Sequence, residues 1–351
     1  MNISLLSRQE CSFLKGIAIM GVIVHNYCHL IHTAVKENEF NWLIQNVIEL
    51  NNRLKGEFDS RIILDLFSYF GSFFLPIFVF LSGYGLVCKH EDIDSQKEDT
   101  FSTFFIHNFR KLFLLLLVGY VAYIISQELT CGYFQHNFLS ILGMLSMTVN
   151  ILCCSNVFIE PGPFWYFGLT IQLYMVYRLF LYRKSNLFLL SFTLLSLLLQ
   201  IFVKPDGDLL KWYKYNIVGS MMPFCLGIYL ARIRCCVLPT SLYILVLFSS
   251  LIGMWFFPMN YYGWLLTPAI IIIGSICFVK ICPMLCVRAF SSIGRISMYI
   301  FIFHPTFRAF LYPVPELGDL VAYYFILYIV CTLIWCYFYS WMTKKKAVNY
   351  Y

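Results

Sequence analysis

Long apolar runs separated by short polar turns follow one another along almost the whole chain. Several approach the roughly 20 residues that a helix needs to cross a hydrocarbon core about 30 Å thick, and no long polar region interrupts them to form a soluble domain. The pattern predicts an all-α, polytopic integral membrane bundle in which residues 1–351 form a single domain. The apolar segments fall near residues 13–31, 64–88, 112–127, 138–154, 164–182, 186–203, 215–231, 238–257, 263–282, 290–311 and 320–342.

Basic residues beside short loops indicate which turns face the cytoplasm. Counting back from a C-terminal TKKK placed inside puts the basic turns at residues 283–295, 232–234 and 183–184 inside as well. Counting forward from an N-terminus placed in the cytoplasm makes the segment at 112–127 cross the membrane from the inside to the outside. The two counts agree only if the segment near 138–154 is re-entrant or interfacial. We therefore expect about ten transmembrane helices, with both termini cytoplasmic.

Two connections are long enough to hold structure of their own. Residues 32–63, on the outside, repeat apolar side chains with a helical rhythm and predict an amphipathic helix over the outer mouth or a plain packing helix. Residues 89–109, on the inside, mix charges of both signs and predict a solvated linker without a site.

Composition excludes several classes of function. The chain is 60% hydrophobic and only 12% charged, against about 25% charged in soluble domains. The net charge of +7 comes from basic residues at the ends of segments, which fits membrane topology and not nucleic-acid binding. Most of the 14 cysteines lie in apolar segments and serve as small hydrophobes. No metal-ligand spacing, phosphate loop or GxSxG elbow is visible, so we expect no metal.

Three histidines stand out in the stretch GVIVHNYCHLIH: His25, His29 and His32. An ionisable side chain within an apolar span is costly and is a candidate for function, although it can also be an interior residue bonded to a neighbouring helix. His25 and His29 are one turn apart, and Lys15 returns to within about 40° of His29 on an ideal helix. A polar stripe thus faces the bundle interior, whereas His32 reaches the outer interface.

Four stretches, taken together, resemble the integral membrane acyltransferase family 3, whose members decorate surface polysaccharides and lipids with acyl groups. They are FLKGIAIMGVIVHN at 13–26, FFLPIFVFLSGYGL at 73–86, FWYFGLTIQLYMVYRLF at 164–180 and SSIGRISMYIFIFHPTF at 291–307. The resemblance implies a membrane O-acyltransferase that moves acetyl or another short acyl group from cytoplasmic acyl-CoA to a hydroxyl of a cell-surface polysaccharide or lipid-linked glycan. It implies acyl-CoA as co-substrate and no permanently bound cofactor.

The family's first helix carries Arg eleven positions before an essential histidine, whereas this chain has Lys15 and, eleven positions on, Asn26. His25 comes one residue early, so the role of base falls to His25 or to His29. Imidazole, with a reference pKa of about 6.5, suits removal of a hydroxyl proton. Catalysis is therefore predicted at His25 and His29.

The remaining candidates are assigned by side of the membrane. Lys15, Arg110 and Lys111 are expected to bind the phosphates of acyl-CoA at the inner mouth, although topology alone also explains them. Candidate substrate contacts are Trp165, Glu160 and His304. Trp165 can instead be a packing aromatic, and His304 can instead cap a helix break expected at Pro305.

Two other functions fit a helix bundle with polar groups at mid-depth. A transporter or exporter of a glycan or acyl carrier would use the same architecture without forming a bond, although no inverted repeat is visible. A glycan polymerase is a further alternative. In each case the partners are a glycan and the lipid bilayer, and no nucleic acid is expected.

Overall fold

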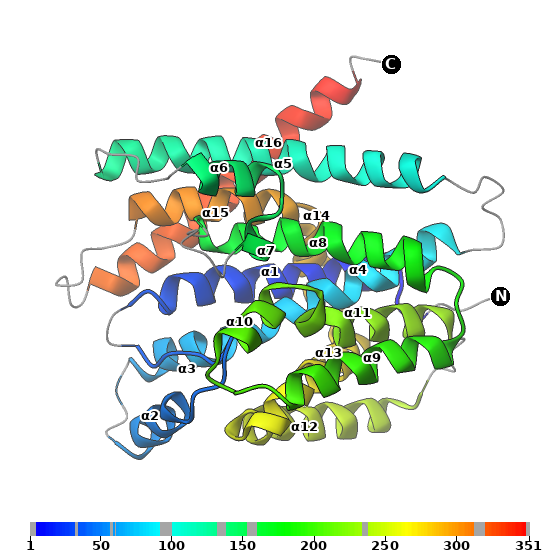
Figure 1. The fold of residues 1–351 in the computed structure, drawn as a ribbon. Coiled ribbons are helices and arrows are strands. Elements are labelled where there is room, and N and C mark those ends of the chain that lie inside the picture. The colour runs from blue at the N-terminus through cyan, green and yellow to red at the C-terminus, as the bar shows by residue number, and fades with distance from the viewer. Residues whose placement is uncertain are drawn as a thin grey trace.

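The computed structural model describes residues 5–31, 34–56, 59, 61–91, 100–131, 138–152, 160–233, 238–311 and 320–348, and within these ranges every regular element is helical (Figure 1). The elements are α1 (Arg8–Cys28), α2 (Ile44–Lys55), α3 (Ile62–Phe70), η1 (Gly71–Phe74), α4 (Leu75–His90), α5 (Phe101–Cys131), α6 (Phe138–Leu145), α7 (Val149–Leu152), η2 (Gly162–Phe164), α8 (Trp165–Val176), η3 (Tyr177–Leu181), α9 (Asn186–Ile201), α10 (Asp208–Tyr215), α11 (Ile217–Arg232), α12 (Thr240–Phe256), η4 (Phe257–Met259), α13 (Tyr261–Ile281), α14 (Met284–Arg295), α15 (Ser297–Leu311) and α16 (Leu320–Val348).

Six helical segments in the described chain are long and apolar enough to cross a membrane: Arg8–Cys28, Ile62–His90, Phe101–Thr130, Thr240–Met259, Tyr261–Ile281 and Leu320–Thr343. The pair α14 and α15, bent by 68°, makes a seventh if it is one span. The prediction of about ten spans is not confirmed by this criterion. Helices α8, α9 and α11 have 12, 16 and 16 residues, which is short for a full crossing.

The segment near 138–154 forms two short helices, α6 of eight residues and α7 of four. Met147 lies between them with a positive φ of 58°, which turns the chain. Eight helical residues rise only about 12 Å, so neither helix can cross a bilayer. This agrees with the prediction that the segment does not cross alone.

The outer connection contains the expected amphipathic helix, α2, which lies beside α3 (Figure 1). Val47 and Leu50 face the protein, and Leu50 packs with Tyr69 of α3. The helix begins later than the apolar rhythm indicated, at Ile44, because Phe40 belongs to an irregular, bent segment that precedes it. In the other long connection, α4 continues to His90 and α5 begins at Phe101, so the expected linker is shorter, and its residues 92–99 lie outside the described chain.

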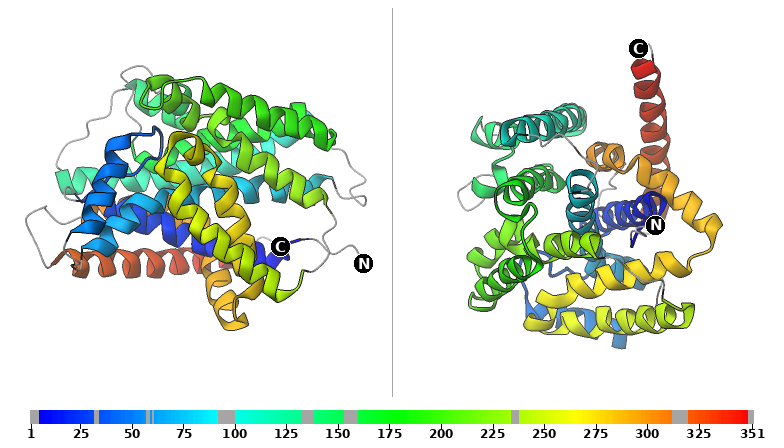
Figure 2. Two further views of the ribbon diagram at one scale, coloured as in Figure 1. Left: turned by 90° about the horizontal axis from the view of Figure 1, so that it is seen from below. Right: turned by 90° about the vertical axis from the view of Figure 1, so that its right-hand side faces the viewer.

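Helix α1 runs through the middle of the bundle (Figure 2). It packs backbone to backbone against α14, because a Cβ at Gly16 would lie 2.0 Å from the carbonyl oxygen of Phe290 and one at Gly294 would lie 1.7 Å from that of Ser12. Small residues allow such close approach between membrane helices. This packing holds the middle and the C-terminal half of the first helix, including His25, inside the protein.

Candidate functional site

The predicted histidines lie at the end of α1, in its last turn and cap. His25 is 4% exposed, and His29 caps the helix one turn later. Their ring centroids are 5.3 Å apart, as the spacing of four residues predicts. His32 lies outside the described residues.

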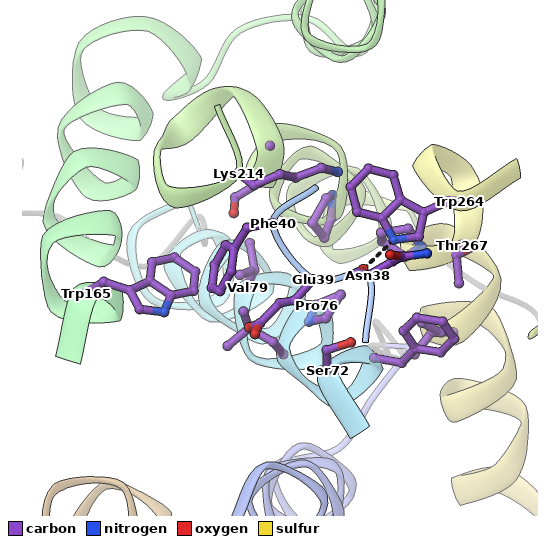
Figure 3. Close-up of a pocket in the computed structure, with 17 residues that line it drawn as sticks. Asn38, Glu39, Phe40, Ser72, Pro76, Val79, Trp165, Lys214, Trp264 and Thr267 are labelled. Atoms are coloured by element: carbon purple, nitrogen blue, oxygen red, sulfur yellow. Dashed lines mark hydrogen bonds between the residues drawn. The ribbon is translucent and has the colours of Figure 1, made fainter. Parts of the chain in front are cut away.

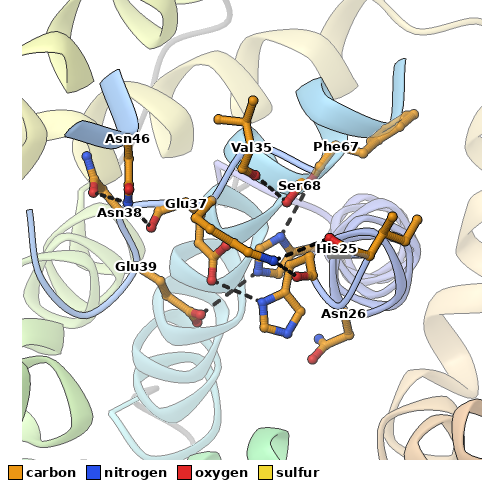
Figure 4. Close-up of polar contacts among 12 residues, drawn as sticks. His25, Asn26, Val35, Glu37, Asn38, Glu39, Asn46, Phe67 and Ser68 are labelled. Atoms are coloured by element: carbon orange, nitrogen blue, oxygen red, sulfur yellow. Dashed lines mark hydrogen bonds and ion pairs between the residues drawn. The ribbon is translucent and has the colours of Figure 1, made fainter. Parts of the chain in front are cut away.

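An irregular segment of residues 34–43, here called the outer strap, brings one carboxylate to each imidazole (Figure 4). Glu37 Oε1 lies 3.2 Å from His29 Nδ1, and Glu39 Oε2 lies 3.9 Å from His25 Nε2. Sequence reasoning treated both acids as loop residues. They are the main functional groups that it missed, and the only signal was two acids spaced by one residue.

The second nitrogen of His25 faces the backbone of α3. His25 Nδ1 lies 3.4 Å from the carbonyl oxygen of Phe67, which can only accept a hydrogen bond. This contact favours the tautomer with a proton on Nδ1 and a lone pair on Nε2. Gly71 keeps the ring in place from another side, because a Cβ there would lie 2.3 Å from the Cβ of His25.

Buried polar contacts hold the beginning of the outer strap against α3. Asp65 Oδ1 accepts a hydrogen bond from the backbone nitrogen of Val35 at 3.0 Å, and Ser68 Oγ donates one to the carbonyl of Val35 at 2.6 Å. Arg53 Nε of α2 donates to Asp65 Oδ2 at 2.7 Å. Because these groups are largely shielded from water, their loss would leave buried polar atoms unpaired.

Asn38 holds the other half of the outer strap. Its Oδ1 accepts hydrogen bonds from the backbone nitrogen of Leu43 at 3.0 Å and from Asn46 Nδ2 at 2.9 Å. Both neighbours of Asn38 in sequence, Glu37 and Glu39, are the acids that face the histidines. The hydrogen bonds of Asn38 therefore help to position both carboxylates.

The charges around Glu37 favour its ionised form. Burial raises the pKa of Glu37, but the hydrogen bond from His29 and the positive charge of His25 and His29 outweigh it and hold the pKa below the ordinary value of 4.5. Glu37 is thus a carboxylate at neutral pH and can stabilise an imidazolium.

A cavity of about 330 Å³ opens beside the histidines. Four of the predicted site residues meet in its wall: His25, His29, Glu160 and Trp165. Tyr166, Glu39, Tyr123 and Arg308 also line it, and sequence reasoning gave the last three no role. The cavity therefore joins imidazole, carboxylate, guanidinium and aromatic rings, a combination that fits the binding of a polar, ring-shaped molecule.

His304 does not line this cavity. It is fully buried in α15, where its Nδ1 lies 3.2 Å from the carbonyl oxygen of Ile300. The helix does not break at Pro305, where a break or kink was expected, because α15 continues through that residue to Leu311. The bend lies instead at Ile296, between α14 and α15.

The three predicted donor-binding cations lie away from the cavity. Lys15, Arg110 and Lys111 are all exposed, and the charge of Lys111 is close enough to act on Lys15. Within the described chain none of the three forms an ion pair or side-chain hydrogen bond. Lys15 precedes His25 by ten residues, which is about 15 Å along the helix.

Other residues of the four quoted stretches serve packing. A Cβ at Gly83 would lie 2.4 Å from the carbonyl oxygen of Phe224, so this glycine lets α4 approach α11. Tyr84, the next residue, accepts a hydrogen bond from the backbone nitrogen of Leu6. These residues shape the bundle around α1 and do not reach the cavity.

Three side chains of the cluster could also hold a metal ion. Ligand atoms of His25, His29 and Glu37 all lie within 4.8 Å of one another. The sequence showed no such group, because Glu37 arrives through the fold of the outer strap and not through local spacing. The hydrogen bond of His29 to Glu37 already explains why two of these three side chains lie close together, without any metal ion.

Comparison with known proteins yields one match. A family model described as an acyltransferase domain matches residues 10–341, which is nearly the whole chain. No curated protein and no solved structure matches the chain significantly.

Proposed function

Since the chain belongs to acyltransferase family 3, we propose that it is a multi-pass membrane O-acyltransferase that transfers acetyl or another short acyl group. In this proposal the donor is cytoplasmic acyl-CoA. The acceptor is a hydroxyl of a cell-surface polysaccharide or of a lipid-linked glycan. Both termini are cytoplasmic, in keeping with the start of α1 and the end of α16 pointing to the same end of the bundle (Figure 1).

One observation carries the proposal: a buried imidazole whose basic nitrogen is presented to a cavity. His25 Nδ1 is directed to the carbonyl of Phe67, which leaves Nε2 for the cavity side, where Glu39 lies 3.9 Å away. A general base must be within hydrogen-bond reach of the proton that it removes, and the position of His25 in the cavity wall allows this.

The acceptor hydroxyl would donate a hydrogen bond to His25 Nε2. As its oxygen attacks the thioester carbonyl, the proton moves to Nε2, and Glu39 stabilises the imidazolium that forms. The tetrahedral intermediate then collapses with cleavage of the carbon–sulfur bond. The leaving CoA thiolate takes the proton from His25, which regenerates the neutral base.

Donor and acceptor would enter from opposite ends of α1. Lys15, Arg110 and Lys111 supply three exposed positive charges for the polyanionic end of acyl-CoA. The flexible arm of the donor would reach along the helix toward His25. Trp165 and Glu160, in the wall of the outer cavity, would contact the acceptor.

Proton NMR of purified surface polysaccharide tests the proposal. Cells that lack the protein are compared with cells restored by the wild type, by His25→Ala or by His29→Ala at matched membrane levels. We expect the acyl signals to vanish without the protein and to return with the wild type but not with His25→Ala. The His29→Ala variant shows whether the two histidines share the role of base.

The alternatives give different results. If acylation does not depend on the protein while the amount of exported glycan does, the chain is a transporter or exporter. If glycan length changes instead, a polymerase is indicated. Thioester loss from acyl-CoA by the purified protein, in the presence of glycan, distinguishes both from a transferase.

A further inference from the structure

A second, smaller cavity of about 80 Å³ lies against the first. The two share five residues in their walls: Glu39, Phe40, Ser72, Leu75 and Trp165. The second cavity is completed by α10, α11 and α13 (Figure 3). The two cavities are therefore neighbours, separated by side chains that belong to both walls.

Lys214 of α10 directs its ammonium along the wall of the second cavity (Figure 3). Its Nζ lies 4.1 Å from the centre of the Trp264 ring, and in the described part of the chain this ring face is the only partner found for it. Enclosed lysines are almost always paired with a carboxylate. A cation that meets only an aromatic ring is therefore suited to receive an anion from outside the protein.

The fold makes room for Lys214 and fixes what surrounds it. A Cβ at Gly219 would lie 2.6 Å from the Cα and 3.0 Å from the Cδ of Lys214, so a glycine there keeps space for the lysine stem. Trp264 Nε1 donates a hydrogen bond to the carbonyl of Asn38 at 2.7 Å. Lys211, three residues earlier on the same helix, is exposed, which shows that α10 also has a face open to solvent.

Aromatic rings line the boundary between the two cavities. Phe40 of the outer strap stacks on Tyr215 with centroids 4.0 Å apart and planes within 10°, and it meets Trp165 edge to face at 5.5 Å. Rings of this kind pack well against the apolar faces of sugars. The outer strap thus contacts both sites: Glu39 faces His25, and Asn38 and Phe40 line the second cavity beside Lys214.

We propose that Lys214 forms an anion-binding subsite for the acceptor, which holds a carboxylate of an acidic sugar or a phosphate of a lipid-linked glycan while the hydroxyl to be acylated lies at His25. The inference rests on the proposed transferase function, for which it specifies the class of acceptor. Lys214 is a positioning residue and does not touch the reacting atoms.

The acid–base properties of the pocket agree with this role. Burial lowers the pKa of Lys214 to about 7. Among the residues that line the second cavity, Glu39 is the only other titratable side chain, and its carboxylate faces His25 on the opposite side. A bound anion favours the protonated lysine, so its affinity should fall as the pH rises through 7.

Binding of small probes to the purified protein in lipid nanodiscs tests the subsite without an acyl donor. The probes are glucuronate, glucose 1-phosphate and neutral glucose, measured by saturation-transfer NMR titration at pH 6.5. We expect the wild type to bind at least one anionic probe about tenfold more tightly than glucose. Preference for glucuronate assigns a carboxylate to the acceptor, and preference for glucose 1-phosphate assigns a phosphate.

Three variants separate the role of Lys214 from general damage. Lys214→Gln should abolish the preference for the anion and leave glucose binding unchanged, whereas Lys214→Arg should retain it. Lys211→Gln, on the exposed face of α10, is the matched control and should behave as the wild type. Equal binding of all three probes to the wild type, or an unchanged preference in Lys214→Gln, would overturn the subsite.

The result is independent of the proposed chemistry. His25→Ala should keep the preference for the anionic probe, because binding needs no base. If acylation fails while the preference holds, the transferase proposal is wrong and the anion site remains. If acylation is confirmed while the preference is absent, the subsite alone is wrong.

Discussion

The predicted site residues near the two ends of α1 are organised in opposite ways. At the outer end, each imidazole faces its own carboxylate at 3.2 to 3.9 Å, and the strap that supplies the acids is held by buried hydrogen bonds. Toward the inner end, Lys15, Arg110 and Lys111 are exposed, and among the described residues none of them has an ion-pair partner.

This difference fits two roles: the imidazole base must react with a hydroxyl, whereas the three cations need only attract the phosphates of the donor. A base has to be held within a fraction of an ångström of its target, and paired, bonded residues provide that order. Phosphates are held by charge that follows a flexible ligand, which exposed and mobile cations provide. Substitutions at the outer end should therefore alter kcat, and those at the inner end should alter KM.

The largest effect is expected when the outer cluster is displaced without loss of any functional group. Gly71→Ala places a Cβ within 2.3 Å of the His25 side chain, so the ring must shift. We expect kcat for acyl transfer to fall roughly a hundredfold. Gly85→Ala on α4 is the control, because a Cβ there meets nothing within 4 Å. Equal activity of the two variants would show that the position of His25 does not matter.

Removal of one charge from the outer cluster should have a smaller effect. Glu39→Gln keeps the shape but loses the carboxylate that faces His25 Nε2. The imidazolium formed during transfer is then less stable, and we expect roughly a tenfold lower kcat with little change in KM for acyl-CoA. A change in KM alone would show that Glu39 acts in donor binding and not in catalysis.

The inner end is tested by neutralising Lys15, Arg110 and Lys111 together to glutamine. We expect KM for acyl-CoA to rise roughly fivefold while kcat is kept, because each exposed contact contributes little. The effect should shrink at high salt. Arg288→Gln, another exposed cation, controls for net charge. A fall in kcat with unchanged KM would contradict the division between the two ends.

The smallest effect concerns the stability of the outer strap. The pKa of Glu37 is below 4.5 in the folded protein, so its pairing with His29 stabilises the fold above that pH and is lost as the pH falls through the folded-state pKa. We expect Glu37→Gln to lower Tm by about 1–2 °C at pH 7 and to match the wild type in acid. A pH-independent difference would mean that the pairing is not electrostatic.

Much of the fold followed from local pattern. The apolar segments correspond to observed helices, the amphipathic helix α2 was anticipated, and so was the finding that the segment near 138–154 does not cross alone. Helical periodicity acts over a few residues, so it can be recognised without knowledge of neighbours. The number of spans was not predictable in the same way, because α9 and α11 are apolar but only 16 residues long.

The sequence by itself determined that His25 and His29 would share one face of the first helix, because four residues make about one turn. Only the tertiary structure decided that Glu39 faces His25, that His304 lies outside the cavity and that Lys214 meets Trp264. Each of these contacts depends on the path of a connection or on the packing of helices far apart in sequence. A loop can bring many different residues to the same point, whereas a helix brings only those at its own period.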